Sequence, residues 1–326
     1  MTAPEVITIG ETMVIFNPDQ SLPLEYAHSF TKQIGGAESN VAVGLSRLGH
    51  KAGWISRVGS DPFGYYIQQV IRGEGVDTSL VTMDDKAPTG VFFKERKTGD
   101  SVNVYYYRAH SAASQMTEED LDRDYFKNAE YVVVSGILPA LSASCRKTTD
   151  KVIQIAKDLT IPIVFDPNVR MKLWKDKDEA ASVLNDIAAQ SDVILIGDAE
   201  GHLLTGTNEP AEIADFYKRL APGTTVVVKL GAEGAYYSNG EESAFVSGFP
   251  VSKVVDPIGA GDSFAAGFIS AQLRGLDLYS SVRMGNAAGA ITVQVSGDIE
   301  GFPRSFELEK MLQSAEKENY TDDVNR

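Results

Sequence analysis

The chain has 326 residues, of which 45 are acidic and 30 basic, so its formal net charge at pH 7 is −15. This balance argues against a nucleic-acid partner and against an anionic membrane surface, because there is no basic excess to meet their phosphates. Apolar residues make up 43% and charged residues 23% of the chain, as is typical of a globular protein with a sizeable core. The length suits one large α/β domain or two ordinary domains.

Cys145 is the only cysteine, which excludes a disulfide framework and a cysteine-based metal site. The first residues contain no basic segment followed by a long apolar one, so no signal peptide is expected. No apolar run reaches membrane-spanning length. We therefore expect a cytoplasmic protein.

The first third of the chain predicts strands with one amphipathic helix between them. Val41, Leu45 and Leu48 recur at helical spacing and define one apolar face. Two glycines open this helix, and Gly49 is a suitable stop. Strands are expected at 6–10, 51–59 and 77–83.

Residues 89–109 have a different pattern. Two runs rich in β-branched and aromatic residues, "TGVFFKER" and "SVNVYYYRA", flank the turn-like stretch 97–100. This pattern predicts an antiparallel hairpin that protrudes from the main domain.

From residue 118 onward, short apolar runs alternate with helical patterns. Nearly continuous apolar runs are typical of strands buried on both faces. Strands are expected at 131–137, 161–167, 192–197 and 224–231, with helices at 142–159 and 209–220 among them. This alternation predicts a parallel sheet with helices on both sides, and hence an α/β fold.

The stretch 256–268, "DPIGAGDSFAAGF", places bare backbone at the start of a helix. Phe264 and Phe268 are four residues apart, so we expect the helix to begin near Asp262. Gly259, Ala260 and Gly261 would then present free amides to an anion. Asp262 beside them suits a general base that takes a proton from an alcohol while the amides stabilise developing charge. The alternative is that Asp262 is only a helix cap or a first-turn acid.

The sequence lacks the motifs of other nucleotide-binding proteins and of hydrolases. The sequence contains no GxxxxGK[ST] stretch, and "GAGDSF" lacks the third glycine of a dinucleotide fingerprint. Four histidines are scattered and form no HExxH motif, so a zinc site or a Ser-His-Asp triad has little support.

Two predicted strand ends carry polar residues that could complete a nucleotide site. Ligands of open parallel sheets bind beyond the carboxyl ends of the strands. Each stretch taken alone is more typical of a turn or a helix cap. The residues are Asp166, Asn168 and Arg170 after one strand, and Lys229, Gly231 and Gly234 after another.

The stretch 35–49, "GGAESNVAVGLSRLG", together with 256–268, resembles the two signatures of the ribokinase-like (PfkB-type) carbohydrate kinase family. The resemblance covers nearly the whole chain. It implies a single three-layer α/β/α domain over 1–326 with a central, mostly parallel sheet. It also implies a small β-sheet lid formed discontinuously by about 11–34 and 89–110.

The resemblance also implies chemical roles. Asp262 would be the general base, and the 259–261 backbone the anion hole for a phosphoryl group transferred from ATP with Mg²⁺. The cofactor-binding residues would be Asn168, Lys229, Gly231, Gly234 and Asn286. The family's Asn-x-x-Glu motif corresponds here to "GDAE", in which Gly197 replaces the asparagine and Glu200 would act on the metal through water.

The predicted hairpin limits the range of possible sugar substrates. Tyr106 and Arg108 share a strand face, and an arginine in a sugar pocket favours an anionic group on the sugar. The alternative is that Arg108 pairs with a surface acid. The stretch "YYR" followed by small residues is similar to that of 2-keto-3-deoxygluconate kinases. That similarity implies phosphorylation of the 6-hydroxyl of this keto acid and a substrate site of Gly35, Gly36, Asn40, Phe92, Tyr106, Arg108, Arg170 and Asp298.

Three hypotheses therefore stand: a 2-keto-3-deoxygluconate kinase, another kinase of the family acting on fructose, ribose or a related acid sugar, and a non-catalytic sugar-binding protein. In this family, lids commonly pair between subunits, and an uncovered sheet edge invites pairing. We expect a homodimer or a higher homo-oligomer.

Overall fold

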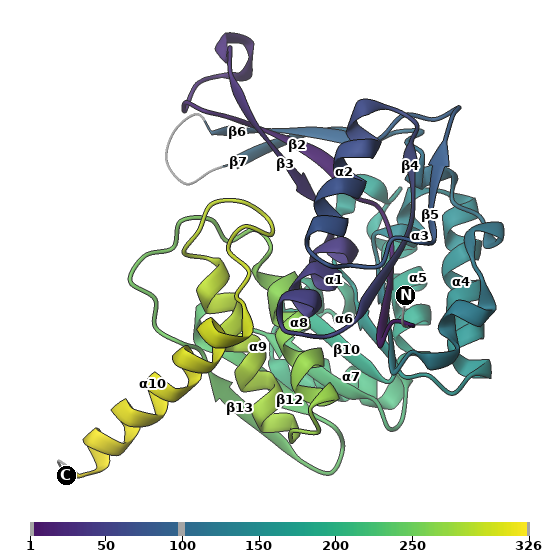
Figure 1. Ribbon diagram of the computed structural model, residues 1–326. Helices are drawn as coiled ribbons and strands as arrows, with labels where there is room; N and C mark the ends of the chain where they lie inside the picture. The colour runs from purple at the N-terminus through teal and green to yellow at the C-terminus, as the bar shows by residue number, and fades with distance from the viewer. Residues whose placement is uncertain (1–2, 97–101, 325–326) are drawn as a thin grey trace.

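A nine-stranded, mostly parallel sheet forms the centre of the computed structural model, which describes residues 3–96 and 102–324 (Figure 1). The strand order is β13-β12-β11-β10-β9-β8-β1-β4-β5, and only β12 and β13 run antiparallel to their neighbours. The expected α/β class is confirmed. The strands are β1 (Val6–Ile9), β4 (Ala52–Gly59), β5 (Val81–Asp84), β8 (Tyr131–Ser135), β9 (Ile163–Asp166), β10 (Val193–Gly197), β11 (Thr225–Lys229), β12 (Gly234–Ser238) and β13 (Ser243–Ser247).

Helices cover both faces of this sheet, because successive strand side chains point to opposite faces. Val133 belongs to the apolar cluster on one face, whereas Val132 and Val134 belong to the cluster on the other. The first face carries α1 (Ala37–Arg47), α2 (Pro62–Gly73), α8 (Ala260–Leu273) and α9 (Leu278–Thr292). The second face carries α3 (Leu138–Leu141), α4 (Ala143–Asp158), α5 (Lys177–Ala188), α6 (Asp198–Thr205) and α7 (Pro210–Leu220).

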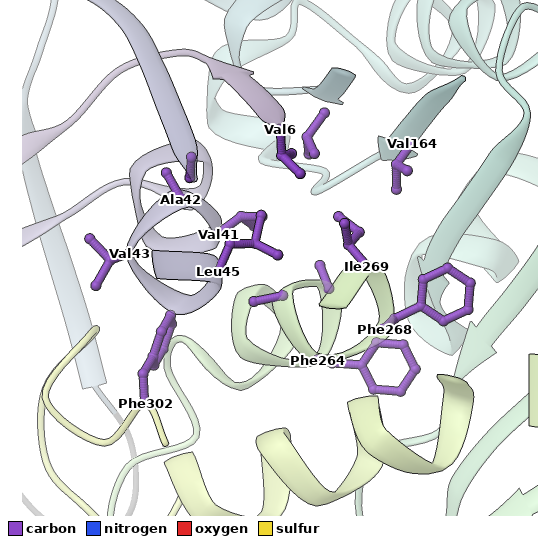
Figure 2. Packing of buried hydrophobic residues seen from close by; sticks show 14 of the residues in the cluster. Val6, Val41, Ala42, Val43, Leu45, Val164, Phe264, Phe268, Ile269 and Phe302 are labelled. Atoms are coloured by element: carbon purple, nitrogen blue, oxygen red, sulfur yellow. The ribbon is translucent and has the colours of Figure 1, made fainter. Parts of the chain in front are cut away.

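Packing on the first face fixes α1 against α8, the two helices that carry the quoted glycine-rich stretches. Figure 2 shows Val41 and Leu45 of α1 beside Ile269 of α8 in one buried cluster. Phe264 and Phe302 belong to the same cluster. Burying such side chains is worth about 1.5–3 kcal/mol each. The two helix N-termini are therefore held in one place relative to the sheet.

A separate four-stranded sheet projects beyond the main sheet (Figure 1). We call it the lid; its strand order is β3-β2-β6-β7, and β6 and β7 form the predicted antiparallel hairpin. The predicted turn at 97–100 lies outside the described residues. Aromatic rings hold one lid face together, with Phe16 and Phe93 stacked at 5.1 Å between centroids. The strands are β2 (Met13–Pro18), β3 (Phe30–Gly35), β6 (Val91–Arg96) and β7 (Val102–Tyr107).

The remaining helical elements lie at the ends and in connections. The last helix, α10 (Ser305–Val324), extends away from the body of the molecule (Figure 1). Within residues 3–96 and 102–324, no helix has the length and apolar character needed to cross a membrane. Short 3-10 helices occupy Leu24–Tyr26, Ala113–Gln115, Glu118–Asp120, Arg123–Asn128, Met171–Leu173 and Gly231–Glu233.

Candidate active site

Two adjacent cavities meet at the carboxyl ends of the central strands. The lid cavity, of about 550 Å³, lies between the lid and the sheet and is lined by residues of both. The inner cavity, of about 320 Å³, is lined mainly by residues that follow β11 and by α8 and α9. Lys229, Gly231, Pro257 and Gly261 line both cavities. A group passing from one cavity to the other would therefore pass Gly261 and Lys229.

The glycine turn, residues 259–261, stands at this junction. Gly259 has φ +80°, the left-handed conformation that favours glycine, and α8 begins at Ala260, two residues before Asp262 and close to the expected start. A Cβ at Gly259 would lie 2.3 Å from the carbonyl oxygen of Asp298, so no side chain fits there. At Gly261 a Cβ would meet only the Lys229 ammonium, at 3.6 Å. Amides of a first helical turn have no partner within the helix, so this turn can receive an anion.

Asp262 is the carboxylate beside this turn. Asn40, from α1, donates its side-chain N–H to Asp262 Oδ2 at 2.8 Å. Burial raises the pKa of Asp262 to about 7, and the nearby charges of Asp166 and Asp298 add to the rise. The Asn40 hydrogen bond and the Lys229 charge oppose it. A carboxylate with such a pKa is suited to proton transfer near neutral pH.

Asn40, predicted as a sugar-site residue, has a contact that the sequence did not reveal, because its amide nitrogen lies on Asp262. The residue still lines the lid cavity. Its contribution seen here is to orient Asp262 and to favour the ionised form of that carboxylate.

Lys229 and two acidic residues, Asp166 and Glu200, lie at or just after the ends of three neighbouring strands, β11, β9 and β10. The Lys229 ammonium is 2.6 Å from Asp166 Oδ2. Burial alone would lower the pKa of Lys229, but the carboxylates of Asp166 and Glu200 outweigh it and raise that pKa. Lys229 is therefore a fixed positive charge between the two cavities.

Glu200 is the predicted metal-side residue. Its carboxylate accepts the backbone N–H of Gly197 at 2.9 Å and that of Val169 at 2.7 Å. Burial, and then the Asp166 charge, raise the pKa of Glu200. Among residues 3–96 and 102–324, no cluster of three or more His, Cys, Asp or Glu side chains has the arrangement of a metal site. In the structure, the Glu200 carboxylate links the end of β10 to the segment that follows β9.

The predicted nucleotide residues divide between the two cavities. Gly231, Gly234 and Asn286 line the inner cavity, as does Lys229. Asn168 lines the lid cavity instead. Its backbone has φ +36°, and its buried Oδ1 has no hydrogen-bond partner in the described structure. Sequence position alone could not separate Asn168 from the others.

Two of the predicted nucleotide-binding residues, Asn286 and Gly234, also stabilise the local structure. Asn286 donates its side-chain amide to the carbonyl oxygens of Val246 and Ser247, at 2.9 and 3.2 Å, and so ties α9 to the end of β13. Gly234 has φ +121°, and a Cβ there would lie 2.1 Å from Val246 O. The rest of the inner cavity is small or apolar, with Phe249, Phe264, Gly289 and Val293 among its lining residues.

All the predicted sugar-site residues line the lid cavity. Gly35 and Gly36 have no room for a side chain, since a Cβ would lie 2.3 Å from Asp298 Oδ2 and 2.3 Å from Glu11 O respectively. The rings of Phe92 and Tyr106 lie 5.3 Å apart, and the Arg108 guanidinium lies 5.6 Å from the Tyr106 ring centroid. The period-two argument that placed Tyr106 and Arg108 on one face is supported by this contact.

Arg108 also has a partner that the sequence did not reveal. Its guanidinium forms an ion pair with Glu11, whose side chain is 1% exposed. Glu11 accepts a second hydrogen bond, from Ser111 Oγ at 2.5 Å. Arg108 does pair with an acid, as the alternative held. That acid is not on the surface, however, because Glu11 is a buried residue just before the lid. Arg170 is exposed, and its guanidinium donates to its neighbour's carbonyl oxygen on Val169.

Lys94 is a second residue that sequence analysis missed. It lies two positions after Phe92 on β6 and also lines the lid cavity. Its ammonium is 3.2 Å from Asp298 Oδ1, so Asp298 is ion-paired as well as exposed to the cavity. The period of two in "VFFKER" could have placed Lys94 on the Phe92 face, but not beside Asp298.

The comparisons with known proteins agree with this geometry. Residues 3–304 match the pattern of the pfkB family carbohydrate kinases. A 2-dehydro-3-deoxygluconokinase of Bacillus subtilis (strain 168) is 42% identical over 309 residues, which cover 94% of this chain and 95% of that one. A 5-dehydro-2-deoxygluconokinase of Clostridium botulinum (strain Eklund 17B / Type B) is 32% identical, covering 99% and 96%.

A solved structure also has the same fold. It is an E. coli protein described as ribokinase II in complex with ATP and Mg²⁺, which superposes with a TM-score of 0.88 at 26% identity and covers 95% of this chain and 99% of that one. The ribokinase-like fold predicted from the sequence is thus confirmed, with its central sheet and separate small sheet. The family pattern spans nearly all of the sequence, and the chain belongs to the pfkB family of carbohydrate kinases.

Proposed function

We propose that this kinase transfers the γ-phosphoryl group of ATP to the 6-hydroxyl of 2-keto-3-deoxygluconate (2-dehydro-3-deoxygluconate), giving the 6-phosphate and ADP. One observation carries the proposal. Asp262 and the glycine turn lie where the two cavities meet, with Arg108 in the cavity on the sugar side. The 42% identity to a 2-dehydro-3-deoxygluconokinase supports the choice of sugar.

The inner cavity suits the nucleotide. Its Phe249, Phe264 and Val293 offer apolar surface to a base, and its glycines leave room for close approach of the backbone to phosphates. Asn286 is the polar residue that we assign to the base end. When bound, ATP supplies the phosphoryl group, and Mg²⁺ neutralises charge on its phosphates. Glu200 and the buried Oδ1 of Asn168 would hold that ion, through water.

In the transfer step, Asp262 takes the proton of the sugar hydroxyl while that oxygen forms a bond to the γ-phosphorus. The bond between the γ-phosphorus and the bridging oxygen breaks, and that oxygen leaves with ADP. Amides of the glycine turn and the Lys229 ammonium face the charge that develops on the transferring group. These contacts are electrostatic and positional, as phosphoryl transfer requires.

The lid cavity suits an acid sugar. A guanidinium has five N–H donors, and the single Glu11 carboxylate cannot use all of them. The remaining donors of Arg108 are available to a substrate carboxylate, with exposed Arg170 as a second cation at the cavity. Phe92 and Tyr106 would cover the carbon chain of the sugar, and Asp298 would accept a hydrogen bond from one of its hydroxyls.

The test is ADP release with Mg²⁺-ATP and a panel of sugars. The panel holds 2-keto-3-deoxygluconate, 5-keto-2-deoxygluconate, fructose, ribose and gluconate, and the phosphate position is found by proton-phosphorus correlation in NMR spectra of the product. We expect a strong preference for 2-keto-3-deoxygluconate and a phosphate on C6. Preference for 5-keto-2-deoxygluconate, the second candidate because of the 32% identical relative, would overturn the proposed substrate.

The same panel separates the other hypotheses. Turnover of only fructose or ribose would keep the kinase and refute the carboxylate role of Arg108. Binding of a sugar by calorimetry with no turnover of any panel member would support the non-catalytic hypothesis.

A further inference from the structure

Lys94 is a buried lysine that the proposed function leaves unassigned. The residue is 1% exposed, and it lies on lid strand β6. Residues two apart on a strand share a face, so Lys94 points into the lid cavity with Phe92. A lysine is rarely buried unless it is paired.

Two carboxylates from distant parts of the chain meet this ammonium. Asp298 Oδ1 lies 3.2 Å away, and Asp256 Oδ2 lies 4.0 Å away, with both side chains nearly fully buried. One cation beside two acids leaves the cluster with an excess of negative charge. Lys94 is for this reason a poor receptor for a sugar carboxylate, a role that Arg108 fits better.

One acid also packs against the glycine turn, and the other contacts the residue just before it. A Cβ at Gly259 would collide with the backbone oxygen of Asp298, which shows how closely these two backbones approach. Asp256 accepts the backbone N–H of Ile258 at 3.2 Å. Lys94 thus connects a lid strand to both segments that flank the anion site.

The Asp298 carboxylate has the geometry of a sugar-binding group held from behind. One oxygen faces Lys94, and the other lies against Gly35, where a Cβ would come within 2.3 Å of Oδ2. Burial raises the pKa of Asp298, and the Asp256 charge adds to the rise. The Lys94 charge and hydrogen bond act against it, as does a hydrogen bond from Asn40. Without Lys94, the acid would hold its proton more readily and would donate rather than accept hydrogen bonds.

We propose that Lys94 is a positioning residue of the sugar site, which keeps the Asp298 carboxylate ionised and oriented toward a sugar hydroxyl. It acts through Asp298 and makes no contact with the carboxylate of the substrate. The inference rests on the proposed function only in that a carbohydrate occupies the lid cavity. It does not depend on which acid sugar is the substrate.

The test is a double-mutant cycle of Lys94→Met and Asp298→Asn, measured with the carbohydrate that the wild-type enzyme phosphorylates. Lys94→Met alone should lower kcat/KM for the sugar about 10- to 100-fold, since a charge-assisted hydrogen bond is lost. The KM for ATP should stay within about twofold. In the Asp298→Asn background, the same substitution should cost less than about twofold, because its target is already neutral.

Lys86→Met is the matched control. Lys86 is an exposed lysine in the segment that leads into β6, and its backbone N–H donates to Asp84 Oδ1. Its substitution should leave both KM values unchanged. If Lys94→Met does not fold by circular dichroism, Lys94→Gln carries the same cycle, because it removes the charge and keeps an N–H donor.

Three results would overturn the proposal. The first is unchanged sugar kinetics in Lys94→Met. The second is full additivity in the cycle, which would mean that Lys94 acts independently of Asp298. The third is an equal rise in the KM for ATP. Failure of wild-type enzyme to use 2-keto-3-deoxygluconate would instead overturn the proposed substrate, and the cycle would still be decided with the sugar that it does use.

Discussion

Removal of the Asn40 amide should move the pH dependence of catalysis in one direction. Asn40 donates to Asp262 Oδ2 at 2.8 Å, and this bond favours the ionised carboxylate. Asn40→Ala deletes the donor and leaves the burial of Asp262 in place. The pKa of Asp262, about 7 in the native protein, should therefore rise.

The size of the rise follows from the energy of the bond. A hydrogen bond to a charged group contributes about 1.5–3 kcal/mol, and one pKa unit corresponds to about 1.4 kcal/mol. The expected rise is thus roughly one to two units. At pH 7 about half of the wild-type base is ionised, whereas only about 1–10% would be ionised in the variant. The value of kcat/KM at pH 7 should fall about 5- to 50-fold, and the deficit should shrink to less than about 1.5-fold near pH 9.5.

The assay is kcat/KM for the sugar from ADP release between pH 5.5 and 9.5, because this parameter reports the pKa of the free enzyme. Asn208→Ala, at an exposed asparagine between α6 and α7, is the control and should keep the wild-type profile. A loss of kcat/KM that is equal at all pH values would refute this reasoning. It would show that Asn40 binds the sugar, as the sequence predicted, and does not tune the base.

Four further outcomes are expected. Asp262→Asn should lower kcat about 10²–10⁴-fold while calorimetry shows sugar affinity within about threefold of wild type, because only the proton acceptor is lost. Arg108→Met should lower the free energy of unfolding in urea by about 3–5 kcal/mol, since Glu11 is left buried without its partner, and adding Glu11→Gln should restore most of that stability but not acid-sugar turnover. Gly259→Ala should lower the melting temperature and kcat together, because φ +80° and the carbonyl of Asp298 both exclude a Cβ. The edge strands β3 and β7 of the lid should pair between subunits, so light scattering should show a dimer or larger species, and a monomer would contradict this.

The strands of the second half could be predicted closely from the sequence. β8 and β11 lie inside the expected 131–137 and 224–231, because strands buried on both faces are nearly continuous apolar runs. The antiparallel strands β12 and β13 at one end of the sheet were not predicted. Exposed Phe245 in β13 stands between Ala244 and buried Val246, and Tyr236 and Tyr237 stand side by side in β12, so neither strand alternates apolar and polar residues. Such a pattern fits a strand or a loop equally well.

The site was predictable where function depends on local chain geometry. Gly259 and Asp262 could be placed because glycines at a helix start have a local physical reason. Lys94, Glu11 and the partner of Asn40 could not be placed in this way. Lys94 and Asp298 are 204 residues apart, and only the packing of the lid over the sheet brings them together.

Burial and the carboxylates around Asp262 would make it a stronger base in the proposed reaction. An aspartate at its usual pKa of 3.8 is always ionised near neutral pH but accepts protons weakly. Burial, with the charges of Asp166 and Asp298, raises that pKa to about 7 and so strengthens the base. A further rise would leave too little of the ionised form. Asn40 and Lys229 oppose it, which places the pKa of Asp262 where the fraction ionised and the basicity are both substantial.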